Sequence, residues 1–219
     1  MKEEQFVNQV QQAQARRGFH RVYEGPYWYY LDLDIEHAIN PSYVWPQLKP
    51  GDSEILTCED NINSLLNSDW IKYANDRIGW PIEFVMHFIR REGRVDLVAH
   101  SDAPVKTQDR SSYWAINWSL APDDREQVWF DYPVHDFLWT HDDSPSTVGF
   151  YPYLVDSDRI CDRVNIQQRP TLIRIDRPHW VTNGGFRIGV SLRFLPLVEN
   201  ESWEWAVEHF KQRGLLVPR

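Results

Sequence analysis

The segment 98–104 places a histidine and a carboxylate two residues apart, at His100 and Asp102. His100 ends an apolar run that predicts a strand. Side chains two residues apart in a strand point to the same face. A third ligand to a metal is expected from His179, which follows a second predicted strand at 171–176. Two imidazoles and one carboxylate on one side of a metal leave its other positions open to reactants.

A His-x-Asp pair is a weak signal by itself, and the chain has a second one at His141 and Asp143. The second pair lies in a polar turn, 140–146, without a predicted strand before it. His100 instead ends an apolar run and precedes the predicted strand at 112–120. Because a short motif depends on its structural context, the first pair is favoured as the metal-ligand pair.

Short runs of β-branched and aromatic residues, separated by turn residues, dominate the chain after Pro81. They predict strands at 82–89, 94–99, 112–120, 127–132, 171–176, 180–182 and 186–194, after an earlier strand that begins at Tyr27. Helical spacing of apolar residues predicts helices at 3–16, 60–77 and 201–213, the second with Asp60 as its N-cap. Because the strands follow one another without alternating helices, the pattern favours an antiparallel sandwich or a jelly roll.

The chain has 219 residues, which is enough for one well-buried core, and 42% of them are hydrophobic, as in folded proteins. We expect a single domain over 1–219. Residues 1–80 would give helical and strand support, 81–194 a β core and 195–219 a C-terminal helix. The aromatic, turn-rich stretch 133–168 is expected to form a lid or insertion over the site.

A net charge of −9 argues against binding to nucleic-acid phosphates, which requires a basic face. No apolar run approaches the roughly 20 residues of a membrane helix. The first residues, 1–5, lack the apolar run of a secretory signal, so we expect a cytoplasmic protein. The sequence does not indicate an oligomeric state.

Four pieces in order resemble the 2-oxoglutarate and Fe(II)-dependent oxygenases, including the prolyl and aspartyl hydroxylases. They are His100-Ser101-Asp102, Ala115-Ile116-Asn117-Trp118, Pro170-Thr171-Leu172, and Pro178-His179-Trp180-Val181-Thr182-Asn183 leading to Arg187-Ile188-Gly189-Val190-Ser191. The resemblance covers 82–194, just over half of the chain. It implies a mainly β fold, a double-stranded β-helix (jelly roll, cupin-like) with flanking α-helices. It also implies Fe(II) on His100, Asp102 and His179, with 2-oxoglutarate as cosubstrate and O2 as oxidant.

The resemblance further implies a basic residue, shortly after the second histidine, that binds the far carboxylate of 2-oxoglutarate. Arg187 follows His179 by eight residues and Arg193 follows it by fourteen, and both are candidates. A guanidinium group can hold a carboxylate through two parallel hydrogen bonds. Ser191 shares the predicted strand face of both arginines and could add a hydroxyl donor. A buried amide at Asn117 needs partners, which either the backbone or 2-oxoglutarate could supply.

Asn183-Gly184-Gly185 predicts a β-hairpin, because these residues tolerate the positive φ angles of tight turns. A three-residue loop would pair Val181 with Arg187 and put Arg187 on the face of His179. A two-residue loop would turn Arg187 to the other face. Spacing and loop together favour Arg187 over Arg193. In the three-residue register Gly189 lies opposite His179 and would leave room for a ligand.

The favoured function is therefore 2-oxoglutarate-dependent hydroxylation of an amino acid, a peptidyl residue or a small metabolite, with release of succinate and CO2. Four tryptophans are expected to shape the pocket wall: Trp114, Trp118, Trp129 and Trp139. One alternative is a cupin-like metal protein, an isomerase, another dioxygenase or a sensor, that does not use 2-oxoglutarate. The other is a non-catalytic β-sandwich that binds glycans through its aromatic residues.

Overall fold

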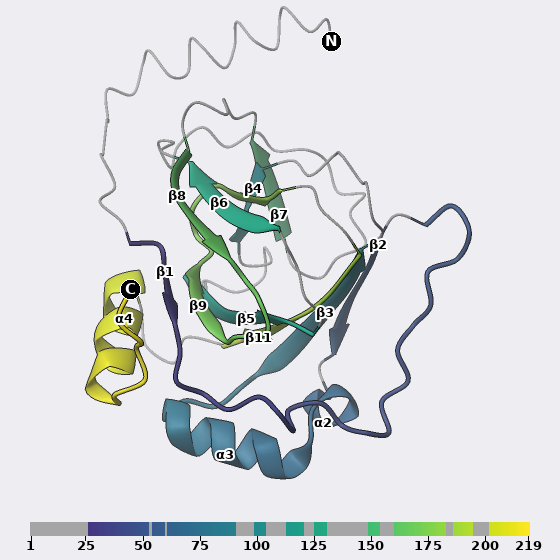
Figure 1. Ribbon diagram of the computed structural model, residues 1–219, viewed down its shortest axis with the longest axis horizontal. Coiled ribbons are helices and arrows are strands. Elements are labelled where there is room, and N and C mark those ends of the chain that lie inside the picture. The colour runs from purple at the N-terminus through teal and green to yellow at the C-terminus, as the bar shows by residue number, and fades with distance from the viewer. Residues whose placement is uncertain are drawn as a thin grey trace, which may run out of the picture.

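The computed structural model describes ten stretches of the chain, and the predicted helix at 3–16 lies outside them. They are residues 26–52, 54–59, 61–90, 99–103, 113–120, 125–130, 149–153, 160–182, 186–194 and 202–219. Only the backbone is described for Cys58 and for residues 99–103 and 149–153. This part of the chain is mainly β, with two antiparallel sheets and few helices, and is compatible with a β-sandwich (Figure 1).

The larger sheet has six strands and the smaller has five. The six-stranded sheet has the order β1 (Trp28–Tyr30), β9 (Thr171–Arg174), β5 (Trp114–Ser119), β11 (Arg187–Arg193), β3 (Phe84–Arg90), β2 (Glu54–Glu59). The five-stranded sheet has the order β7 (Gly149–Tyr153), β4 (Ala99–Ala103), β10 (His179–Val181), β6 (Glu126–Phe130), β8 (Ile160–Asn165).

From β3 to β6 and from β8 to β11 the chain passes back and forth between the sheets, and β7 lies in the smaller sheet. Strands β3, β5, β9 and β11 belong to the larger sheet, and β4, β6, β8 and β10 belong to the smaller one. The predicted hairpin between Val181 and Arg187 is therefore wrong, because β10 pairs with β4 and β6 while β11 pairs with β3 and β5. Residues 183–185 lie outside the described part, between two strands that belong to different sheets.

Side chains alternate between the two faces of the larger sheet. The outer face packs against helices α3 (Ser68–Ile78) and α4 (Trp203–Gln212), which flank this sheet in Figure 1. The main outer-face residues are Trp114, Ile116, Trp118, Val190 and Leu192. Full burial of such a side chain stabilises the fold by about 1.5–3 kcal/mol. The inner face packs on the smaller sheet, where Ala115 and Ile173 meet Trp129 and Val164.

The predicted helix at 60–77 is interrupted, which corrects that prediction. A short helix, α2 (Ile62–Leu65), ends before the extended residue Leu66, and α3 begins separately at Ser68. The reason is Asn67, whose side chain accepts hydrogen bonds from the backbone N–H groups of Asp69 and Trp70 and so starts a new helix. No helix among the described residues is long and apolar enough to cross a membrane.

Two strands come from the stretch 133–168 that was predicted as a lid. They are β7, which pairs with β4, and β8, which pairs with β6. The rest of that stretch, apart from 166–168, lies outside the described residues. Strand β2 was not predicted from the sequence, and it forms one edge of the larger sheet.

Candidate metal and anion site

The two histidines proposed as metal ligands are direct neighbours in the smaller sheet. The backbone of His179 on β10 pairs with that of His100 on β4, and on its other side with Trp129 on β6. Trp129 belongs to the inner cluster and Trp180 to a separate cluster on the other face, so His179 lies on the inner face. Positions directly opposite on neighbouring strands share a face, so position 100 is an inner-face position as well.

The His179 side chain is 4% exposed, and its Nδ1 lies 2.8 Å from the backbone carbonyl oxygen of Arg177. Since a carbonyl oxygen can only accept, Nδ1 carries the proton. In the neutral ring the lone pair is then on Nε2, and metal-bound histidines commonly hold their second ring nitrogen in this way. His179 therefore has the tautomer that a metal ligand requires.

Asp102 is placed by the backbone of β4, where it pairs with Phe150 of β7. Strand alternation returns position 102 to the face of position 100. Among the side chains that the structure describes, no group of three His, Cys, Asp or Glu residues could hold a metal ion. His100 and Asp102 do not belong to that set, because only their backbone is described.

All four residues predicted to bind 2-oxoglutarate lie on the inner face of the larger sheet. Arg187, Ser191 and Arg193 lie at alternate positions of β11 and are 2%, 2% and 7% exposed. Asn117 on the neighbouring strand β5 pairs directly with Ser191 and is 8% exposed. The structure therefore brings these residues onto one wall, which faces the sheet of His179.

Several polar atoms on these two walls have no hydrogen-bond partner within the described part of the chain. They are Oδ1 of Asn117, Oγ of Ser191 and Nε2 of Gln127, the last on β6 and 3% exposed. Gln127 lies two residues before Trp129, so it shares the inner face. A buried polar group without a partner costs about 1–3 kcal/mol. Such atoms on both walls indicate a place for a polar ligand or for water.

The registers separate the two candidate arginines along the sandwich. Arg193 is the last residue of β11 and pairs with Phe84 of β3. Arg187 is six residues away on the same strand, about 20 Å along an extended chain. A five-carbon dicarboxylate is much shorter than this separation. One arginine can bind its far carboxylate only if the other has a different role.

Phe88 fills the space over Gly189, contrary to the expectation that this glycine leaves room for a ligand. A Cβ atom built on Gly189 would lie 2.1 Å from the Phe88 ring. Two guanidinium groups lie over the same ring. The Cζ atom of Arg187 is 4.6 Å from the ring centroid, and that of Arg90 is 5.5 Å from it. Glycine is therefore needed here for an aromatic side chain of the protein.

The turn before His179 is fixed by buried polar contacts. Arg174 donates to both carboxylate oxygens of Asp176, at 2.8 and 3.3 Å. The indole N–H of Trp129 donates to the carbonyl of Arg174 at 2.8 Å, and the ring of Tyr27 stacks on Trp129. Burial raises the pKa of the Tyr27 hydroxyl, and Cys161 raises it further, so this hydroxyl stays protonated. These contacts hold the strand end that carries His179.

Of the tryptophans expected in the pocket wall, Trp129 lies on the inner face. Trp114 and Trp118 lie on the outer face instead, where Trp114 stacks on Phe194 and Trp118 packs on Trp70 of α3. Their place follows from strand alternation, because they flank Asn117 on the other face of β5. Trp139 lies outside the described residues.

Sequence reasoning missed Arg90 and Gln127 on the inner face. The predicted strand ended at residue 89, one residue short of Arg90, although alternation from Phe88 would have placed Arg90 on the same face. Gln127 lies within the predicted strand 127–132. Alternation alone cannot say which face is inner, so neither residue could be assigned without the sheet order.

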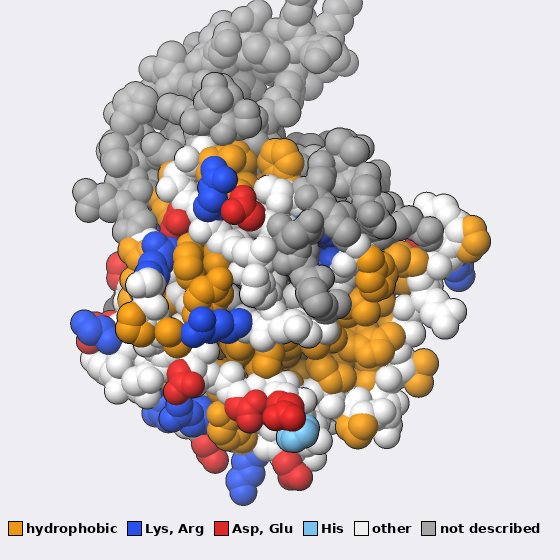
Figure 2. All heavy atoms as spheres, viewed as in Figure 1, with side chains coloured by type: hydrophobic (Ala, Val, Ile, Leu, Met, Phe, Trp, Pro, Cys, Tyr) orange, Lys and Arg blue, Asp and Glu red, His pale blue; other side chains and the backbone are white. Residues whose placement is uncertain are grey.

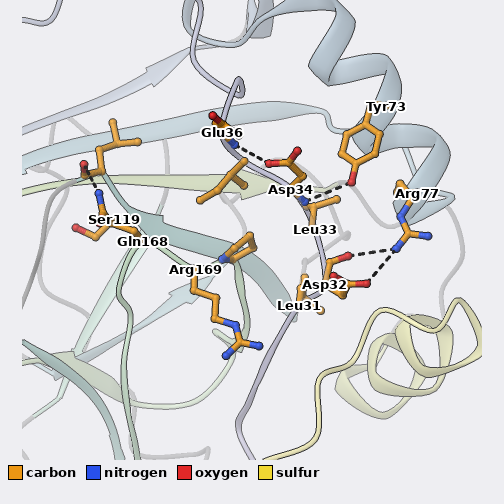
Figure 3. A pocket seen from close by; sticks show the side chains of 13 residues that line it. Leu31, Asp32, Leu33, Asp34, Glu36, Tyr73, Arg77, Ser119, Gln168 and Arg169 are labelled. Atoms are coloured by element: carbon orange, nitrogen blue, oxygen red, sulfur yellow. Dashed lines mark hydrogen bonds and ion pairs between the residues drawn. The ribbon is translucent and has the colours of Figure 1, made fainter.

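The described residues also form an open hollow of about 790 Å3 on the outside (Figure 3). Its walls are the segment 31–36, two residues of α3 and residues 119–120 and 168–170. Tyr73 reaches it from α3 and accepts from the backbone of Asp34, and Arg77 pairs with Asp32 at 3.7 Å. Figure 2 shows acidic side chains near the lower edge of this view, beneath a band of hydrophobic ones. None of the predicted ligand residues lines this hollow.

No protein-family model and no curated protein sequence matches this chain.

Proposed function

We propose that this chain is an Fe(II)- and 2-oxoglutarate-dependent oxygenase that hydroxylates a small molecule or a peptide side chain. The observation that carries the proposal is the direct pairing of His179 with His100 on neighbouring strands. Two histidine positions 79 residues apart in sequence are thereby direct neighbours on adjacent strands. A carboxylate two residues beyond one histidine completes the ligand set that Fe(II) takes in such enzymes.

The strand order supports a double-stranded β-helix, or jelly roll, as the finer description of the fold. From β3 to β6 and from β8 to β11 successive strands fall in opposite sheets, and β7 adds to the edge of the smaller sheet. A jelly roll is a two-sheet arrangement of this kind. In it, β4 and the start of β10 carry the residues proposed to bind the metal.

His179 fits the proposed iron because its Nδ1–H is bound to a backbone carbonyl, which leaves the lone pair of the neutral ring on Nε2, the nitrogen proposed to bind iron. Asp102 would add the single negative charge of the ligand set. When bound, iron and 2-oxoglutarate would supply the oxidative chemistry, in which O2 is consumed and succinate and CO2 are released. The chain's own task is to orient these groups and to exclude water from them.

Arg187 is the residue proposed to bind the far carboxylate of 2-oxoglutarate. It is the first residue of β11, and Ser191 and its partner Asn117 lie between it and Arg193 along the same wall. A dicarboxylate that reaches from the metal toward Arg187 would pass these two side chains, whose Oγ and Oδ1 atoms have no partner within the described part of the chain. Arg193, at the other end of β11, is the alternative residue for this carboxylate.

An anaerobic titration of metal-free protein with Fe(II), followed by 2-oxoglutarate, tests the proposal. We expect a visible metal-to-ligand charge-transfer band that is absent in His179→Ala. In Arg187→Ala the band should require at least tenfold more 2-oxoglutarate, because a hydrogen-bonded charge contributes about 1.5–3 kcal/mol.

The other outcomes identify the alternatives. Iron binding without a response to 2-oxoglutarate would support a cupin-like metal protein, and absence of iron binding would remove the metal hypothesis. If Arg193→Ala raises the required 2-oxoglutarate and Arg187→Ala does not, the roles of the two arginines are exchanged.

A further inference from the structure

We propose that Arg90 is a second anion-binding residue, which holds the far carboxylate of the dicarboxylic cosubstrate together with Arg187. This inference rests on the proposed function, and it deepens it by naming a specificity-determining residue. It predicts a site with two guanidinium groups for one carboxylate, and therefore a strong requirement for a full negative charge at that end of the ligand.

The first observation is the register of β3 and β11. Arg90 pairs directly with Arg187. Directly opposed residues have Cβ atoms about 4.5–5.5 Å apart, and like charges at such positions are destabilising. Arg187 is 2% exposed and the Arg90 side chain is 12% exposed, so water screens this pair poorly. Glu54 pairs with Arg90 at 2.9 Å, and an anion bound between the two arginines would add a second negative charge to this cluster.

The second observation is the common support of the two side chains. Both guanidinium groups contact the ring of Phe88, with Cζ distances to its centroid of 4.6 Å for Arg187 and 5.5 Å for Arg90. Phe88 lies one inner-face position before Arg90 on β3 and lies over Gly189, the next inner-face position after Arg187. The ring therefore holds both groups from the same side and offers an apolar surface to the carbon chain of a ligand.

The third observation is an open hydrogen-bonding position on Arg90. Its Nε donates to Glu54 of the edge strand β2 at 2.9 Å, which fixes the orientation of the guanidinium plane. Its Nη1 is buried and has no hydrogen-bond partner within the described part of the chain. Glu54 thus acts as a positioning residue, and Nη1 remains as a donor that an anion can use.

Titration calorimetry of the metal-free protein with glutarate, a five-carbon dicarboxylate, tests this inference without iron. We expect Arg90→Gln to weaken glutarate binding about tenfold to a hundredfold, the usual effect of losing a hydrogen-bonded charge. Arg90→Lys should recover part of this loss, because it keeps the charge without the planar fork. Arg163→Gln is the matched control, since it removes an exposed arginine of β8 and should bind glutarate like the unaltered chain.

Folding of each variant is checked by its far-UV circular dichroism spectrum and urea midpoint. Equal glutarate affinity in Arg90→Gln and the unaltered chain would overturn the inference, and so would a lack of glutarate binding by the unaltered chain. The charge-transfer titration separates this from the proposed function. If Arg90→Gln loses glutarate affinity but Fe(II) and 2-oxoglutarate give no band in the unaltered chain, the two-arginine site stands and the oxygenase proposal fails. If the unaltered chain and Arg90→Gln both give the band with the same 2-oxoglutarate dependence, the oxygenase proposal stands and the two-arginine inference fails.

Discussion

Replacing Gly189 by alanine should destabilise the protein through a single contact, the ring of Phe88. The added Cβ would lie 2.1, 2.2 and 2.9 Å from three atoms of that ring, whereas ordinary contacts are 3.4–4 Å. The ring must therefore move by more than 1 Å. It cannot do so alone, because the guanidinium groups of Arg187 and Arg90 lie against it.

Overpacking of this kind typically costs about 1–3 kcal/mol. In a chain of this length each 1 kcal/mol lowers the melting temperature by about 2–4 °C, so we expect a loss of about 2–12 °C for Gly189→Ala. The backbone contributes little to this value, because Gly189 does not have a positive φ angle. The assay is urea unfolding followed by tryptophan fluorescence, supported by thermal melting.

A double-mutant cycle with Phe88→Leu isolates the steric contact from other effects of the added methyl group. Leucine lacks the far ring atoms that clash, so Gly189→Ala should cost at least 1 kcal/mol less in the Phe88→Leu background. A cost that is the same in both backgrounds, or an unchanged urea midpoint for Gly189→Ala alone, would refute the reasoning. Phe88 would then not be held over this glycine.

Three further predictions concern other parts of the fold. Asn67→Ala should lower the free energy of unfolding by about 1 kcal/mol, measured by urea unfolding, because α3 loses its side-chain N-cap. Trp129→Phe should cost about 1–3 kcal/mol in the same assay, because the carbonyl of Arg174 loses its buried donor. Burial lowers the pKa of His87 below 6.5, although Glu59 partly opposes the shift. The unfolded chain therefore binds this proton at higher pH than the folded one, so stability should fall as the pH drops below 6.5, and less steeply in His87→Phe.

Much of the strand pattern could be predicted from the sequence, but the assignment of strands to sheets could not. Alternation and turn residues located β3, β5, β6, β9 and β11 to within a few residues. Asn183-Gly184-Gly185 has the turn chemistry of a hairpin, yet it joins strands of different sheets. Glycine and asparagine permit a sharp change of direction, and they do not determine which strand the chain meets next. That choice depends on which faces become buried.

The same limit explains why Arg187 was favoured for a reason that the fold does not support. The predicted hairpin would have placed it in the sheet of His179, whereas it lies on the opposite wall, in the register of Arg90. Its burial on the inner face was consistent with the alternation of β11, which groups it with Ser191 and Arg193. Which side chains of one strand share a face follows from the local sequence. Which residues of the other sheet they meet depends on how the whole chain folds.

A sandwich interior that contains buried arginines, an amide and hydroxyl groups is poorly suited to serve only as a hydrophobic core. Apolar residues fill the outer face of the larger sheet against α3 and α4, where nothing but packing is required. On the inner face Asn117, Ser191 and Gln127 keep polar atoms without partners in the described part of the chain, at a cost of about 1–3 kcal/mol each unless a ligand or water satisfies them. Leucine or valine at these positions would avoid that cost. Their presence on the two inner walls therefore supports the proposal that this interior binds a polar ligand.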